Sequence, residues 1–308
     1  MWSALVVIFA QASAFQHGHH LGVARHSPAS RAGVRALIPS EGEEVEVPRH
    51  LDEVCDRCRQ ALRTSLAAGK RGLRVEAGVP SLDVGSRAYE PAMLARFTLE
   101  LAQALTVLEG PLLVLFPGVN AVTEARKLID AGGDFWPEAE RERLQVSALT
   151  LYGPPRPDEL DWQPPAAVMI AGLTPVGSSD DTTLGHARAW LQFSAVSSCI
   201  AVCLNPRTRL LPPELTRFET AFALVPYTVA RQPAPGEEAC SGEDAGRALL
   251  WRAYPEGWRV LFDAGSSGEY TVLATLDRQP DEAELSELLL PTVTKRRAAL
   301  DSLRGLQP

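Results

Sequence analysis

Residues 112–118 of the chain read LLVLFPG, an apolar run from Leu112 to Phe116 that stops at Pro117-Gly118. A short apolar run bounded by turn residues predicts a strand buried on both faces, as in a parallel sheet covered by helices. Two similar runs follow at Ala166–Ala171 and Cys199–Leu204, and a helix is expected between them at residues 183–196. This alternation of strands and helices predicts an α/β layer with parallel strands.

The C-terminal third has a different pattern, which predicts antiparallel strands and two closing helices. The expected strands are Phe222–Ala230, Ala248–Tyr254, Trp258–Asp263 and Tyr270–Leu276, and the expected helices, Asp281–Leu289 and Thr292–Arg304, are split by Pro291. Pro255-Glu256-Gly257 has the composition of a hairpin turn between the two middle strands. We therefore predict a single α/β domain over residues 48–304, with a mixed sheet, parallel core strands and an antiparallel C-terminal meander.

The first 40 residues have the composition of a disordered targeting leader. A short apolar stretch and the small residues Ala12-Ser13-Ala14 indicate a signal peptide at residues 1–14. Residues 15–40 contain Arg, His, Ser and Ala but no acidic residue, which is typical of a transit peptide. The combination is similar to the bipartite leader of algae with complex plastids and predicts delivery to the chloroplast stroma or the stromal thylakoid surface. The alternative is an ordinary secretory signal followed by a flexible linker.

The charge of the remaining chain limits its partners. The formal net charge of the 308 residues is −8, and no acidic residue lies within residues 1–40, so the body is acidic. An acidic body argues against nucleic-acid binding, because it cannot neutralise phosphates. No apolar run approaches the ~20 residues of a membrane-spanning helix. The basic run Lys295-Arg296-Arg297 could dock on a thylakoid surface or on an acidic partner, although such a run is more often a solvated helix face.

The usual motifs of enzymes and metal sites are missing from the sequence. Cys55 and Cys58 have the spacing of a redox motif, but both continue the apolar face of an expected helix, where cysteine behaves as a small hydrophobe. The five cysteines form no disulfide or zinc pattern, four of the six histidines lie in the leader, and no phosphate-binding glycine motif is present. We therefore predict no catalytic residues, no metal and no cofactor.

Open α/β sheets bind ligands outside the carboxyl ends of their strands. On this basis four polar residues could converge on an anionic group of a small molecule or nucleotide: Thr174, Ser178, Asn205 and Arg207. The alternative is that they form loops and cap helices.

Tyr254 and Trp258 flank the predicted hairpin turn. They can pack into the core or anchor a protein partner, because exposed aromatic residues dominate interface hot spots. Strand alternation points Trp258, Val260 and Phe262 to one face and favours core packing.

The order of several segments resembles a plastid and cyanobacterial family, the domain of unknown function number nineteen ninety-five. The resemblance covers roughly residues 48–304, and these segments carry it: Leu73-Arg74-Val75-Glu76 with Pro80, Arg96-Phe97, Leu112–Pro117, Cys203-Leu204-Asn205-Pro206 and Tyr254-Pro255-Glu256-Gly257-Trp258. The family's usual Phe-Pro-Asp is Phe116-Pro117-Gly118 here.

The same domain occurs in low-photosystem-II-accumulation assembly factors and as a C-terminal extension of plastid adenylate kinases. The resemblance therefore implies a non-enzymatic plastid protein that binds protein partners, such as photosystem assembly intermediates, during photosystem or thylakoid biogenesis. A regulatory domain that binds a small molecule or nucleotide is the alternative function.

We expect the mature protein to begin between Ala36 and Glu46, because the acid-free composition ends at Glu41. N-terminal sequencing of protein purified from plastids measures this directly. A Phe15→Ala change should leave a fluorescent fusion outside the plastid. An intact Met1, or a secreted product, would contradict the prediction.

Overall fold

The computed structural model describes residues 6–10, 46–132, 136, 138–151, 154, 163–173, 181–206, 215, 217–231, 246–263 and 270–304. The chain forms two compact units. The larger unit comprises Val47–Val225 and Trp251–Glu256, and the smaller one comprises Met1–Glu46, Pro226–Leu250 and Gly257–Pro308.

A parallel sheet organises the larger unit. Its strands are β2 (Gly72–Ala77), β3 (Leu112–Phe116), β4 (Leu144–Ala148), β5 (Ala167–Ala171), β6 (Ile200–Leu204) and the first part of β7 (Glu219–Arg231). They lie in the order β7-β2-β6-β5-β3-β4, and every neighbouring pair is parallel. The three apolar runs of the sequence are therefore the adjacent strands β3, β5 and β6, which are almost entirely buried.

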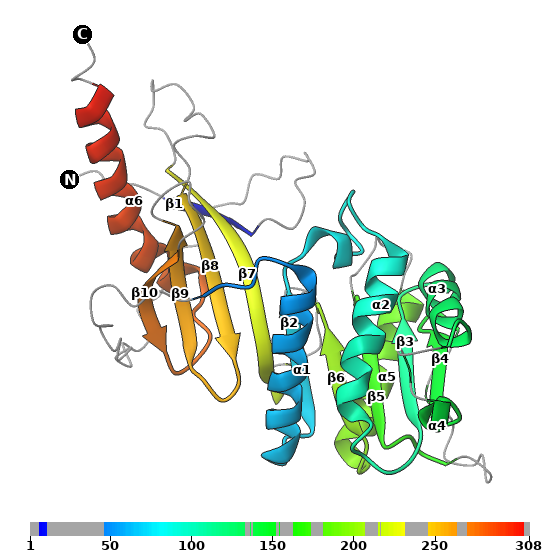
Figure 1. The fold of residues 1–308 in the computed structure, drawn as a ribbon. Helices are drawn as coiled ribbons and strands as arrows, with labels where there is room; N and C mark the ends of the chain where they lie inside the picture. The colour runs from blue at the N-terminus through cyan, green and yellow to red at the C-terminus, as the bar shows by residue number, and fades with distance from the viewer. Residues whose placement is uncertain are drawn as a thin grey trace. The chain divides into compact units, whose positions relative to one another are not determined.

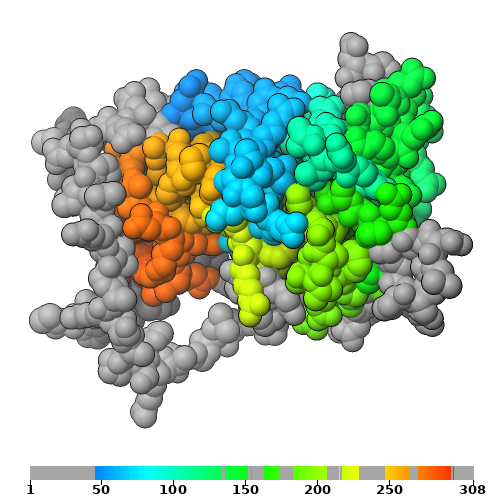
Figure 2. All heavy atoms as spheres, turned by 90° about the horizontal axis from the view of Figure 1, so that it is seen from below, coloured from blue at the N-terminus to red at the C-terminus, as the bar shows by residue number. Residues whose placement is uncertain are grey.

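Helices cover both faces of this sheet (Figure 1). They are α1 (Leu51–Ala67), α2 (Pro91–Ala102), α3 (Val119–Asp130), α4 (Glu138–Arg141) and α5 (Asp181–Val196), with the 3₁₀ turns η1 (Pro80–Leu82) and η2 (Gln103–Leu105). Helices α1, α2 and α3 lie on one face and α5 on the other. Figure 2, seen from below, shows α1 and α2 side by side in blue and teal.

The core follows from this two-sided cover. On the α5 face, Leu113, Leu115, Val168 and Ile170 of the strands pack with Trp190 of α5, and Trp190 meets Phe193 edge to face at a ring-centroid distance of 5.7 Å. Side chains alternate along a strand, so the other residues of β3 and β5 face α2 and α3. The burial of both faces explains the uninterrupted apolar runs in the sequence.

The smaller unit is built on antiparallel pairs. It contains β1 (Val6–Ala10), the second part of β7, most of β8 (Gly246–Ala253), β9 (Trp258–Asp263), β10 (Tyr270–Leu276) and α6 (Glu282–Arg304). β10 pairs antiparallel with β9, and β1 pairs antiparallel with β7. β1 lies within the predicted signal peptide, whereas residues 11–40 of the predicted leader lie outside the described residues.

The expected break at Pro291 is wrong. Residues 282–304 form one helix, α6, with Pro291 inside it. Proline cannot donate to the carbonyl four residues earlier, which is that of Glu287. Both Pro291 and Glu287 are exposed, so water can satisfy this carbonyl and the helix continues.

The predicted fold class is confirmed. The described strands follow the hydrogen-bonded order β10-β9-β8-β7-β2-β6-β5-β3-β4, with β1 paired to β7, in one mixed sheet with a parallel core and antiparallel C-terminal strands. Within the described residues, no helix has the length and apolarity needed to cross a bilayer.

Candidate functional site

The carboxyl ends of β3 and β5 define the candidate site. These strands are hydrogen-bonded neighbours, yet the helices that follow them, α3 and α5, lie on opposite faces of the sheet (Figure 1). Such a reversal is a topological switch point, where the two connections diverge and leave a crevice outside the strand ends. The site is therefore positioned by the order of the strands.

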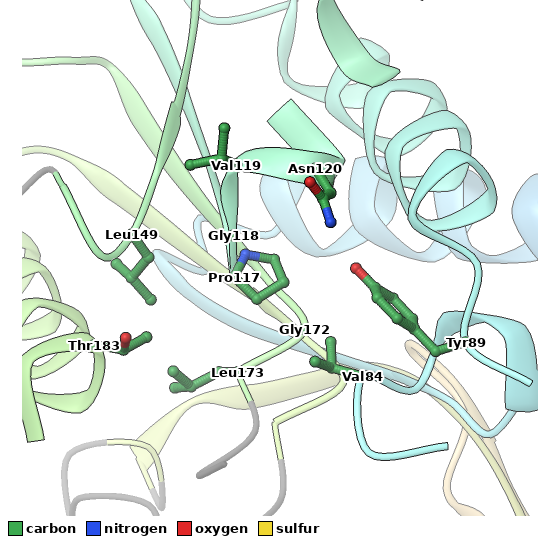
Figure 3. Close-up of a pocket in the computed structure, with 11 residues that line it drawn as sticks. Val84, Tyr89, Pro117, Gly118, Val119, Asn120, Leu149, Gly172, Leu173 and Thr183 are labelled. Carbon is green, nitrogen blue, oxygen red and sulfur yellow. The ribbon is translucent and has the colours of Figure 1, made fainter. Parts of the chain in front are cut away.

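A pocket of about 240 Å³ lies at this switch point (Figure 3). Its apolar walls come from the segments that leave β3, β4 and β5, through Pro117, Leu149 and Leu173. The turn between η1 and α2 adds Val84 and Tyr89 on the side of α2. With Thr183 at the start of α5, five separate segments of the larger unit therefore line one cavity.

Gly172 closes the floor of the pocket. Its φ is +59°, a conformation that a residue with a side chain rarely adopts. A Cβ at this position would lie 2.8 Å from Cγ2 of Val84 and 3.2 Å from Cδ2 of Leu94. The backbone N–H of Gly172 donates to the carbonyl of Leu204 at 3.1 Å. Glycine is therefore required both by backbone conformation and by the close packing above it.

The N-terminus of α3 faces the same pocket. Gly118 is the N-cap residue, its φ of −157° and ψ of 171° are extended, and no side chain caps the helix. The first N–H groups of a helix have no acceptor within the helix, and the first turn of α3 carries no acidic residue. No heavy atom would lie within 4 Å of a Cβ on Gly118. Neither conformation nor packing thus excludes a capping side chain here.

Three polar side chains complete the lining, and each comes from a different element. Tyr89 precedes α2, Asn120 is in the first turn of α3, and Thr183 is in the first turn of α5. In Figure 3, the hydroxyl of Tyr89 points toward Asn120. Burial raises the pKa of Tyr89 above its ordinary value, so the phenol stays neutral and can donate a hydrogen bond.

A second, more open cavity of about 340 Å³ adjoins the first through the shared residue Asn120. It lies between the start of α2, at Pro91 and Ala92, and the first turns of α3, at Thr123 and Glu124. Asn120 is exposed, so its amide can contact a molecule in either cavity.

Of the four predicted ligand-binding residues, the structure describes only Asn205. Its amide oxygen accepts a hydrogen bond from the N–H of Ala77 at 2.6 Å, and its own N–H donates to the carbonyl of Val75 at 2.7 Å. Asn205 therefore joins the ends of β6 and β2, and it does not line the pocket. Thr174, Ser178 and Arg207 lie outside the described residues.

The pocket lies at the edge of the sheet where the sequence predicts a ligand site, but its polar side chains, Tyr89, Asn120 and Thr183, are not among the predicted residues. Asn120 could have been found, because it follows the strand end Pro117-Gly118 at the start of an expected helix. Tyr89 and Thr183 carry no such signal, since only the folded chain brings the turn before α2 and the start of α5 to the end of β3.

A buried polar group links β2 to β7 on the sheet face that α5 covers. Nε of Arg74 lies 2.9 Å from Oε1 of Glu76, and Nε and Nη2 of Arg74 donate to Oγ1 of Thr220 at 3.2 and 2.8 Å. Burial raises the pKa of Glu76, and the charge of Arg74 opposes this shift. Because Arg74 and Thr220 are register partners in β2 and β7, the group is part of the strand pairing.

The four cysteines that the structure describes are all buried. Cys55 and Cys58 are buried in α1, and burial raises the pKa of both thiols. Burial also raises the pKa of Cys199 to about 11 and that of Cys203 to about 12. Protonated, buried thiols are poor nucleophiles, which favours the structural interpretation of Cys55 and Cys58. Among the described residues, no cluster of His, Cys, Asp and Glu is placed to bind a metal.

The two hairpin aromatics differ in burial. Trp258 is 2% exposed, and Val260 and Phe262, on the same face of the strand, are equally buried. Tyr254 is half-buried, and its N–H donates to the carbonyl of Ala221 at 2.8 Å. The burial of Trp258 favours its packing in the core. Binding of a protein partner by Tyr254 stays a prediction.

No family model matches the chain, and no curated protein matches it either.

We expect Gly172→Ala to lower the free energy of unfolding by about 2–4 kcal/mol, because it adds left-handed strain and a steric clash. Chemical denaturation measures the change. Gly69→Ala is the matched control, since Gly69 has a φ of +75° but open space around its Cβ position. This control should lower the free energy of unfolding only by the cost of the left-handed backbone conformation, about 1 kcal/mol. Equal losses in the two variants would show that the packing above Gly172 is not tight.

We expect Trp258→Ala to lower the free energy of unfolding by ~3–5 kcal/mol, the usual cost of removing a buried tryptophan. Thermal unfolding of the variant, together with co-purification of protein partners, separates the two roles of this residue. An unchanged melting temperature with loss of a co-purified partner would support the anchor alternative instead.

Proposed function

We propose that the chain is a binding protein for a small organic molecule, which it holds in the pocket at the carboxyl ends of β3, β4 and β5. The position of this pocket at the switch point between β3 and β5 carries the proposal, because α/β sheets place ligands there. Two further features support it. The walls are apolar with a few convergent polar groups, as ligand pockets commonly are, and an uncapped helix N-terminus faces the cavity.

The size of the pocket favours a small molecule over a nucleotide. Its volume of about 240 Å³ is below the ~300–1,000 Å³ typical of pockets for drug-sized ligands. The sequence also lacks a glycine-rich phosphate loop. Both observations disfavour a bound nucleoside di- or triphosphate.

Gly118→Phe tests the proposal. An extended φ accepts any residue, and a side chain at Gly118 has open space before it, so the ring should fill the pocket without disturbing the core. We expect a library of small organic fragments, screened by ligand-observed NMR, to give binders of the wild-type chain that the variant no longer binds.

Val107→Phe is the matched control, because Val107 is 68% exposed and does not line the pocket. It adds the same aromatic bulk and should keep all the binders. If every fragment binds the wild type and Gly118→Phe equally well, the fragments bind outside the pocket and the proposal is refuted.

The sequence supports a second proposal, in which the chain acts with photosystem assembly intermediates in the plastid. Its support is the acid-free leader and the ordered motifs that resemble the plastid and cyanobacterial family. The two proposals are compatible, since a small molecule could regulate the binding of a protein partner. Sequencing of the mature N-terminus tests the localisation on which this second proposal depends.

A further inference from the structure

The charge of the pocket restricts its ligand. The described lining contains no Lys, Arg, His, Asp or Glu. Phosphate groups carry close to two negative charges and are usually held by Arg or Lys side chains. A phosphorylated ligand would therefore bring two charges into a cavity whose described lining holds no basic side chain. A fully neutral ligand would leave the positive end of α3 unmatched.

The first turn of α3 suits a single negative charge. Aligned peptide dipoles give a helix N-terminus roughly half a positive elementary charge. Among the described residues, no acceptor engages the N–H groups of Val119, Asn120 and Ala121, and no side chain caps the helix. These groups are therefore available to hydrogen-bond an oxyanion that enters the pocket.

Thr183 is a second feature of the pocket, separate from the start of α3, that points to a bound ligand. Its side chain lines the pocket, the residue is 8% exposed, and Oγ1 has no hydrogen-bond partner within the described part of the chain. Threonine inside a helix often bonds to the carbonyl four residues earlier. Because α5 begins at Asp181, no helical carbonyl stands four residues before Thr183. Figure 3 shows its side chain projecting from α5 toward Leu149 and Leu173.

We infer that the ligand is a small monocarboxylate with an apolar body. Its carboxylate accepts hydrogen bonds from the first turn of α3, and the hydroxyl of Thr183 donates a further hydrogen bond to the ligand. Its apolar body packs against Pro117, Leu149 and Leu173. This inference rests on the proposed function, and it names the class of molecule that the pocket binds.

Sets of three compounds that share one apolar body test the ligand class. Each set contains a carboxylate, its primary amide and the corresponding phosphate monoester, namely benzoate, benzamide and phenyl phosphate, or hexanoate, hexanamide and hexyl phosphate. The amide keeps the shape of the carboxylate and removes its charge. Calorimetric titration of the full chain should show at least one carboxylate binding tenfold or more tightly than both partners of its set.

Two variants test the groups that recognise the carboxylate. Gly118→Asp places a capping carboxylate on the N–H groups of α3, so it should weaken carboxylate binding at least tenfold and leave the melting temperature unchanged or higher. Thr183→Val keeps the shape of the side chain and removes its donor, so it should weaken binding about tenfold. His50→Asp is the control. It adds a negative charge at the N-cap of α1, another helix without a side-chain cap, and should leave binding unchanged.

The outcomes separate the inference from the proposed function. If amides or phosphates bind better than carboxylates, and Gly118→Phe blocks them, the pocket binds small molecules but the monocarboxylate class is wrong. The class is also wrong if Gly118→Asp and Thr183→Val both keep wild-type affinity. If Gly118→Phe blocks no compound from these sets or from the fragment library, both the inference and the proposed function fail.

Discussion

The handedness of strand–helix–strand connections is the constraint on which the larger unit depends. A crossover between parallel strands is right-handed, so the direction in which the chain moves across the sheet decides which face each helix covers. From β2 through β3 to β4 the chain moves one way, and from β5 to β6 it moves back. Helices α2 and α3 consequently lie on one face and α5 on the other. Because β3 and β5 are neighbours, the crevice between their ends cannot be filled by either connection.

Hydrogen bonds across the carboxyl edge of the sheet make this crevice a defined pocket. Gly172 donates to Leu204 at the end of β6, and Asn205 then joins β6 to Val75 and Ala77 of β2. The ends of β5, β6 and β2 are thereby held in register beside the pocket. Asn205, for which the sequence predicts a ligand contact, helps to fix the backbone that forms the floor. Its φ of 47° is a left-handed conformation that asparagine tolerates better than most residues.

The sequence predicts the elements of the core well and the site poorly, and the reason is physical. Burial on both faces produces the apolar runs of β3, β5 and β6, so the strands are visible locally. The carboxyl edge is also predictable, because strand direction follows from the alternation of strands and helices. The contribution of Tyr89 and Thr183 depends on strand order, which no local pattern encodes. Pro291 shows the converse error, because a local rule for breaking helices ignores that water can satisfy an exposed carbonyl.

The start of α3 has no side-chain cap, as is also the case for α1 and α2, whereas α6 carries a reciprocal capping pair. In α6, the N–H of Glu284 donates to Asp281 at 2.9 Å, the N–H of Asp281 donates to Glu284 at 3.0 Å, and Glu282 adds a negative charge to the first turn. At α3, Gly118 has the extended backbone of an N-cap but no capping group. Asp, Asn or Ser at such a position typically stabilises a protein by about 1 kcal/mol relative to an alanine. What matters at α3 is the position of the uncapped turn, because Gly118, Val119, Asn120 and Ala121 line the pocket. A capping side chain at this position would occupy the N–H groups that a ligand needs.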